Sequence, residues 1–130
     1  MQRKYFYARG RSLKKSIKMG EILVVNATHF INVKADQLSY YADALLMGRI
    51  PDGEVDLYCW DTLEEWSQVR ASSASITPLE RVFWYLLHQI TFWNSSEIKE
   101  CPKLKSEVDS CIDFIRGDGH YPEFCAGVRP

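Results

Sequence analysis

Two of the three histidines, His29 and His120, and the carboxylates near them are the residues of this chain that could carry out acid–base chemistry. His120 follows Asp118 by two residues in the glycine-containing segment 117–121, and such loops often carry function. A histidine acting as a general base needs a carboxylate to orient it and a nucleophile within reach. No nucleophile elbow or glycine-rich phosphate loop accompanies either histidine. His120, Asp118, His29 and Asp56 are therefore our catalytic candidates, and we lean toward a protein without enzyme activity.

The four cysteines are too widely spaced for a metal site. Zinc ligands come in close pairs, whereas Cys59, Cys101, Cys111 and Cys125 form no Cys-x-x-Cys motif. A disulfide scaffold would need a denser set in a secreted chain. The basic start is not followed by the apolar stretch of a secretory signal, and no apolar run approaches the roughly 20 residues of a membrane span. We predict free thiols, no metal, no cofactor, no membrane contact and a cytoplasmic location.

The charges divide the chain into a basic start and an acidic remainder. Residues 1–20 hold seven basic groups and no acidic one, and residues 21–130 hold 9 basic and 17 acidic groups. The basic start could contact phosphates, but the acidic remainder would repel them and no recognition motif is present. We favour a charged partner protein, or an acidic surface on a second copy, over nucleic acid. The candidate contacts are Arg9, Arg11, Lys14, Lys15 and Lys18.

A predicted helix over 77–93 is apolar almost all round. A cap at Thr77, Pro78 at the first helical position and Glu80 at the third mark its start. Such a helix is either the centre of the domain or in contact with a second copy of the chain. Aromatic side chains and Arg are typical of interface cores, so we predict a homodimer. The candidate interface residues are Arg81, Trp84, Tyr85, His88 and Phe92.

The elements that must position these residues form one predicted domain over 1–130. Aromatic residues predict a strand over 4–9, four consecutive aliphatic residues predict one over 21–26, and alternating apolar residues predict strands over 28–33 and 54–60. Helical periodicity and helix-end signals predict helices over 13–18, 36–47, 61–70, 77–93 and 103–116. Together they predict an α+β fold, a small and largely antiparallel sheet covered by four to five helices. We expect the basic start over 1–20 to form a strand and a helix, and residues 118–130 to form an irregular segment packed on the body.

The C-terminal residues Val128-Arg129-Pro130 resemble the ends of proteins encoded by integron mobile gene cassettes, whose reading frames often run into the recombination site. The resemblance implies a small bacterial accessory protein from a mobile element. We therefore expect a protein that acts through protein–protein interaction, with an immunity or antitoxin role as one form of it. The alternatives are a ligand-binding protein or small enzyme with a His–carboxylate site, and nucleic-acid binding through the basic start.

Overall fold

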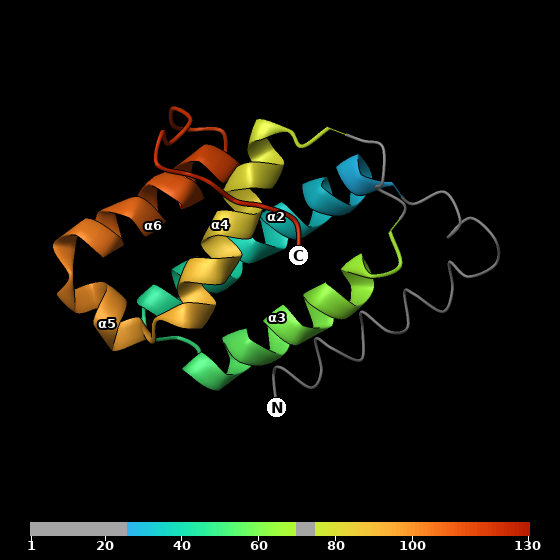
Figure 1. The fold of residues 1–130 in the computed structure, drawn as a ribbon. Coiled ribbons are helices and arrows are strands. Elements are labelled where there is room, and N and C mark those ends of the chain that lie inside the picture. The colour runs from blue at the N-terminus through green and yellow to red at the C-terminus, as the bar shows by residue number, and fades with distance from the viewer. Residues whose placement is uncertain (1–25, 70–74) are drawn as a thin grey trace.

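The computed structural model describes residues 26–69 and 75–130, and within these ranges the fold is all-α (Figure 1). The predicted sheet is therefore wrong for this part of the chain. Apart from Asn26, the predicted strands over 4–9 and 21–26 and the helix over 13–18 lie outside the described residues. The described helices are α2 (Ala27–Leu46), α3 (Asp52–Trp66), α4 (Pro78–Phe92), α5 (Ser95–Glu100) and α6 (Pro102–Ile115).

Helix α2 replaces the strand predicted over 28–33 and joins it to the helix predicted from Asp36. The Asn26 side chain accepts a hydrogen bond from the backbone N–H of His29 at 2.9 Å, which caps the new helix start. Its buried residues recur at helical spacing over the whole length, and Gly48, at a φ of 74°, follows its end. The buried hydrophobic residues of α2 are Ala27, Phe30, Ile31, Ala35, Leu38, Ala42 and Leu45.

Helix α3 likewise replaces the strand predicted over 54–60 and the separate helix predicted from Asp61. Burial along α3 does not alternate, because Val55, Tyr58 and Thr62 are buried whereas Leu57 and Trp60 are exposed. Spacings of three and four residues place the buried set on one helical face. The Tyr58 hydroxyl donates to the backbone carbonyl of Lys34 at 3.2 Å, which joins α3 to α2.

The helices predicted over 77–93 and 103–116 are confirmed as α4 and α6. The Thr77 hydroxyl accepts a hydrogen bond from the backbone N–H of Glu80 at 3.1 Å, and Pro78 is the first residue of α4. Helix α6 begins at Pro102, and Gly117 follows it at a φ of 86°. Between them lies α5, which the sequence patterns did not predict, and Asn94 caps it in a capping box with Glu97.

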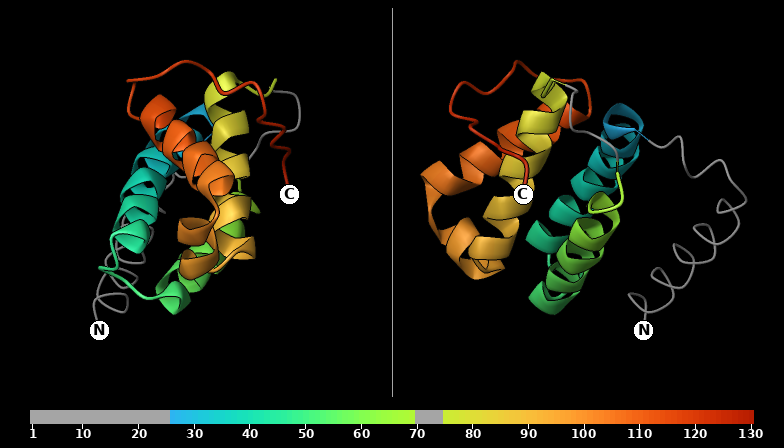
Figure 2. Two further views of the ribbon diagram at one scale, coloured as in Figure 1. Left: turned by 90° about the vertical axis from the view of Figure 1, so that its left-hand side faces the viewer. Right: turned by 45° about the vertical axis from the view of Figure 1, so that its right-hand side comes forward.

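The helices pack around α4, which contacts α2, α3 and α6 (Figure 2). Phe83, Val82 and Leu86 of α4 are completely buried. They meet aliphatic residues of α2 and α6 in one core, which also includes Ile98 from α5. The core therefore lies between α4 and its neighbours α2, α3 and α6. The residues after α6 cover another part of α4.

Residues 118–130, here called the C-terminal segment, form neither helix nor strand and turn back over the body from the end of α6 (Figure 1). Pro122, Cys125 and Gly127 are buried. The ring of Phe124 packs near the ring of Tyr85 on α4, with 5.4 Å between the ring centres. The backbone N–H of Cys125 donates to the carbonyl of Pro122 at 3.1 Å, which closes a turn. The segment is therefore packed on α4 and α6.

Candidate interaction surface

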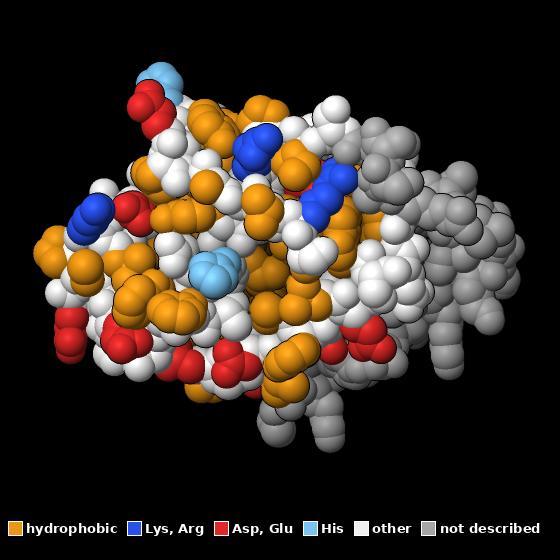
Figure 3. All heavy atoms as spheres, viewed as in Figure 1, with side chains coloured by type: hydrophobic (Ala, Val, Ile, Leu, Met, Phe, Trp, Pro, Cys, Tyr) orange, Lys and Arg blue, Asp and Glu red, His pale blue; other side chains and the backbone are white. Residues whose placement is uncertain are grey.

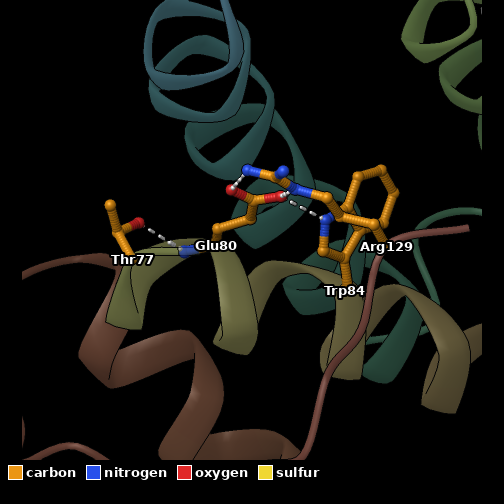
Figure 4. Close-up of polar contacts among 4 residues, drawn as sticks. All are labelled: Thr77, Glu80, Trp84 and Arg129. Carbon is orange, nitrogen blue, oxygen red and sulfur yellow. Dashed lines mark hydrogen bonds and ion pairs between the residues drawn. The ribbon is translucent and has the colours of Figure 1, made fainter. Parts of the chain in front are cut away.

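Glu80 and Arg129 fasten the C-terminal segment to α4 (Figure 4). Arg129 donates from Nε to Oε2 of Glu80 at 2.6 Å and from Nη2 to Oε1 at 2.9 Å. The indole N–H of Trp84 donates to the same Oε2 at 2.9 Å. The guanidinium also lies 5.6 Å from the ring centre of Trp66 on α3, so it is held by a carboxylate and an aromatic ring.

The carboxylate of Glu80 accepts hydrogen bonds from Arg129 and Trp84, although its side chain is only 2% exposed. Burial by itself would raise the pKa of Glu80. The hydrogen bonds from Arg129 and Trp84, together with the positive charge of Arg129, outweigh burial and lower the pKa below its ordinary value. The charged form of Arg129 is stabilised as well, since its hydrogen bond to Glu80 raises the pKa of the guanidinium. The pair is thus a structural connection whose two charges stabilise each other.

The C-terminal segment covers half of the α4 face that we predicted as a dimer interface. Gly127 lies against the backbone of α4, where a Cβ atom would be 2.1 Å from the carbonyl oxygen of Arg81. Trp84 is buried within the chain, between the rings of Trp66 and Phe83. Tyr85 is half-buried and donates from its hydroxyl to Glu107 of α6 at 2.9 Å. Trp84 and Tyr85 therefore have partners inside the chain, and Arg81 is exposed beside the segment.

The other half of that face remains exposed. Phe92 is 65% exposed, and its ring is stacked on the ring of His88, with 5.7 Å between the ring centres. His88 and Thr91 are exposed as well. The predicted interface residues thus separate into Arg81, Trp84 and Tyr85 beside or beneath the C-terminal segment, and His88 and Phe92 beyond it.

Helix α3 carries a second exposed surface, here called the α3 outer face and made of Asp56, Leu57, Trp60 and Glu64. Their spacing of three and four residues places all four on one side of the helix. Trp60 is 68% exposed, and hydrophobic side chains gather over α3 and α4 in Figure 3. Single exposed hydrophobic residues are ordinary, but a tryptophan exposed to this extent beside an exposed leucine is a feature of contact surfaces.

The two exposed surfaces lie at the same level of neighbouring helices. Thr91 of α4 lies close enough to Cys59 of α3 to affect the pKa of its thiol, and the Thr91 hydroxyl itself donates to the backbone carbonyl of Leu87. Trp60 and Phe92 are the next residues along their helices, so the two most exposed aromatic side chains of α3 and α4 flank this contact. Trp60 was not among the candidate residues predicted from the sequence, because a strand was predicted there. Its helical spacing from Asp56 and Glu64 was the signal that could have identified it.

The charged side chains of α3 are all negative. The helix contains six carboxylates and no basic residue: Asp52, Glu54, Asp56, Asp61, Glu64 and Glu65. Glu65 forms an ion pair with Lys34, and Asp52 accepts a hydrogen bond from the backbone N–H of Ser95 at 3.1 Å. Asp56 and Glu64 extend into solvent on either side of Trp60. The α3 outer face is therefore an exposed aromatic side chain between negative charges.

The catalytic candidates are not brought together. His29 lies in the first turn of α2, Asp56 lies on α3, and Asp118 and His120 are exposed after α6. No hydrogen bond joins a histidine ring to a carboxylate within residues 26–69 and 75–130. In the same ranges, no three side chains of His, Cys, Asp or Glu are grouped as metal ligands. The candidates Arg9, Arg11, Lys14, Lys15 and Lys18 lie outside the described residues.

Comparison of the chain with protein-family models, with curated proteins and with solved structures finds no match. None of the helices in the described part of the chain has the length and apolar character needed to cross a bilayer.

Proposed function

We propose that the chain is a non-catalytic binding protein that docks a basic protein through the α3 outer face. The observation that carries this proposal is Trp60, 68% exposed between Asp56 and Glu64 on a helix with six carboxylates and no base. Tryptophan is enriched among the residues that contribute most to binding energy, because its ring buries a large area in one contact. The carboxylates around it would select and steer a positively charged partner.

The same charges argue against two other occupants of this face. Nucleic acid would be repelled, because its phosphates carry the same sign as α3. A second copy of the chain could not place α3 against α3 across a twofold axis without opposing two strongly acidic helices. A basic enzyme, such as a nuclease, has the complementary surface. We infer an accessory role of the immunity or inhibitor type, in the cytoplasm, where the thiols of the free cysteines stay reduced.

The experiment uses the full chain and three variants as bait. Trp60→Ser removes the aromatic contact, and Glu64→Lys reverses one of the two charges beside it. Met47→Ser is the matched control, because Met47 is also an exposed large hydrophobic residue but lies at the end of α2. A partner captured by the wild type is purified, and its dissociation constant for each variant is measured by calorimetry at low and high salt.

The proposal expects a basic partner whose affinity falls at least tenfold with Trp60→Ser, falls with Glu64→Lys and is unchanged with Met47→Ser. Its binding should weaken as salt rises, since the attraction is between opposite charges. An acidic partner, or one that binds Trp60→Ser as tightly as the wild type, contradicts the proposal. So does the absence of any captured protein that depends on Trp60.

Phe92 and His88 support a second candidate, the homodimer. Their stacked rings lie on the half of α4 that the C-terminal segment leaves exposed, and His88 has no carboxylate partner among the described residues. A twofold axis near Phe92 would pair each ring with its copy. Light scattering at micromolar concentration should give a dimer mass for the wild type and a monomer mass for Phe92→Ser. A monomeric wild type removes this candidate.

A further inference from the structure

Two of the four cysteines are in contact, although they lie on different parts of the fold. Cys111 is in the middle of α6 and Cys125 is in the C-terminal segment, and their sulfur atoms are 3.9 Å apart. Cys111 is fully buried and Cys125 is 8% exposed. A disulfide needs a sulfur–sulfur distance of about 2.05 Å, so the two atoms must approach by only about 2 Å.

The surrounding contacts hold this pair together. Cys125 is fixed by the turn from Pro122 and by the Tyr121 hydroxyl, which donates to the Cys125 carbonyl at 3.5 Å. The Tyr121 ring lies against Phe114 of α6, with 5.7 Å between the ring centres. Because both thiols belong to anchored backbone, each is present to the other at a high effective concentration. Neither Cys59, half-buried on α3, nor Cys101, exposed before α6, belongs to this contact.

We propose that Cys111 and Cys125 form a disulfide when the protein meets hydrogen peroxide, and that this bond ties the C-terminal segment to α6. The Cys125 thiolate attacks one peroxide oxygen, the O–O bond breaks, and one water leaves after protonation. The resulting sulfenic acid is attacked by the Cys111 sulfur, so the S–O bond breaks and the second water leaves. Overall, two thiols lose two protons and two electrons, and one peroxide becomes two waters.

Burial sets the pace of this reaction. It raises the pKa of both thiols, so little thiolate is present at neutral pH and the pair reacts more slowly than a low-pKa sensor cysteine. The product is nevertheless favoured, because the reduced pair is already in contact and the bond joins two cysteines that lie 14 positions apart in the unfolded chain. The disulfide therefore forms slowly, and it accumulates only when exposure to peroxide is sustained.

The experiment uses the full chain with Cys101→Ser, which removes the exposed thiol and with it disulfides between chains. After peroxide treatment, trypsin cleaves at Arg116, the only Lys or Arg between the two cysteines, and mass spectrometry identifies the joined peptides. The proposal expects a Cys111–Cys125 cross-link. It also expects a melting temperature raised by roughly 5–10 °C and restored by dithiothreitol.

The controls are Cys125→Ser and Cys111→Ala, each in the same background. Both must lose the cross-link and the rise in melting temperature, and either one serves if the other does not fold. Over-oxidation of Cys111 or Cys125 without a cross-link overturns the proposal. A cross-link that involves Cys59 overturns it as well, as does a pair that stays reduced while Cys59 is oxidised.

Discussion

Arg129 and Glu80, 49 residues apart in the sequence, form a two-point ion pair in which both guanidinium–carboxylate hydrogen bonds are shorter than 3.0 Å. Glu80 is in the first turn of α4, where a negative charge is favoured by the helix dipole. Arg129 brings the matching charge from the C-terminal segment. The start of the central helix and the end of the described chain are thus joined at one point.

Arg129→Met should lower the free energy of unfolding by about 3 kcal/mol, because it leaves the buried Glu80 carboxylate without its opposite charge. The matched control is Arg116→Met. The ion pair between Arg116 and Asp43 is longer, at 3.3 Å, and about one third exposed, so its loss should cost less than about 1 kcal/mol. Urea unfolding at pH 7 measures both values. Equal losses for the two variants would contradict the importance that we assign to Glu80.

The difference between the wild type and Arg129→Met should depend on pH. In the wild type the pKa of folded Glu80 is lowered, so its stabilising contribution is present above the unfolded value of about 4.3 and is lost as pH falls through the folded pKa. In the variant, burial is no longer offset by Arg129, so protonation of Glu80 relieves the penalty. The gap in unfolding free energy should therefore narrow from pH 7 to pH 4. A gap that stays constant over this range argues against an ionised Glu80.

Gly127→Ala should destabilise the protein by roughly 1–3 kcal/mol, because the added methyl group would overlap the Arg81 carbonyl oxygen and push the C-terminal segment away from α4. Gly53→Ala is the contrasting variant. A Cβ at Gly53 meets nothing within 4 Å, and alanine favours the helix in which Gly53 lies. Thermal unfolding measures the melting temperature of both variants. It should be lower than that of the wild type in Gly127→Ala, and unchanged or higher in Gly53→Ala. An unchanged melting temperature for Gly127→Ala would contradict the close contact between Gly127 and the backbone of α4.

Thr77→Ala should cost about 1 kcal/mol, since it removes the hydroxyl that caps α4 at the backbone N–H of Glu80. Thr28→Ala provides the comparison, because Thr28 is exposed inside α2 and alanine is the better helix former there. Chemical denaturation of both variants tests the cap directly. The expectation fails if Thr28→Ala is the more destabilising of the two.

Helices α4 and α6 could be predicted from the sequence because their start signals are local. Thr77, Pro78 and Glu80 act within one turn, and Pro102 and Gly117 bound α6 in the same way. The first parts of α2 and α3, over 28–33 and 54–60, were mistaken for strands, because such short runs satisfy a period of two and a period of 3.6 about equally well. Packing against α4 decided between them, and no local pattern contains that information.

The candidate site was predictable only in part, for a related reason. Phe92 and His88 were recognised from their place on an apolar helix, and both are exposed. Trp84 belongs to the same face, but it is buried between the rings of Trp66 and Phe83. Its indole N–H donates to Glu80, which also binds Arg129 from 49 residues away. The sequence pattern identifies which residues share a helix face. It does not reveal which part of that face a distant segment covers.

The position of α4 has a consequence for how the molecule opens. Helices α2, α3 and α6 and the C-terminal segment all pack on α4, so none of them can detach without exposing part of its aliphatic surface. Partial openings of the periphery are thereby coupled, and the backbone amides of α4 are shielded until the whole assembly separates. In hydrogen exchange, the amides of α4 would report the global free energy of unfolding, while those near the ends of α3 would exchange through smaller local openings.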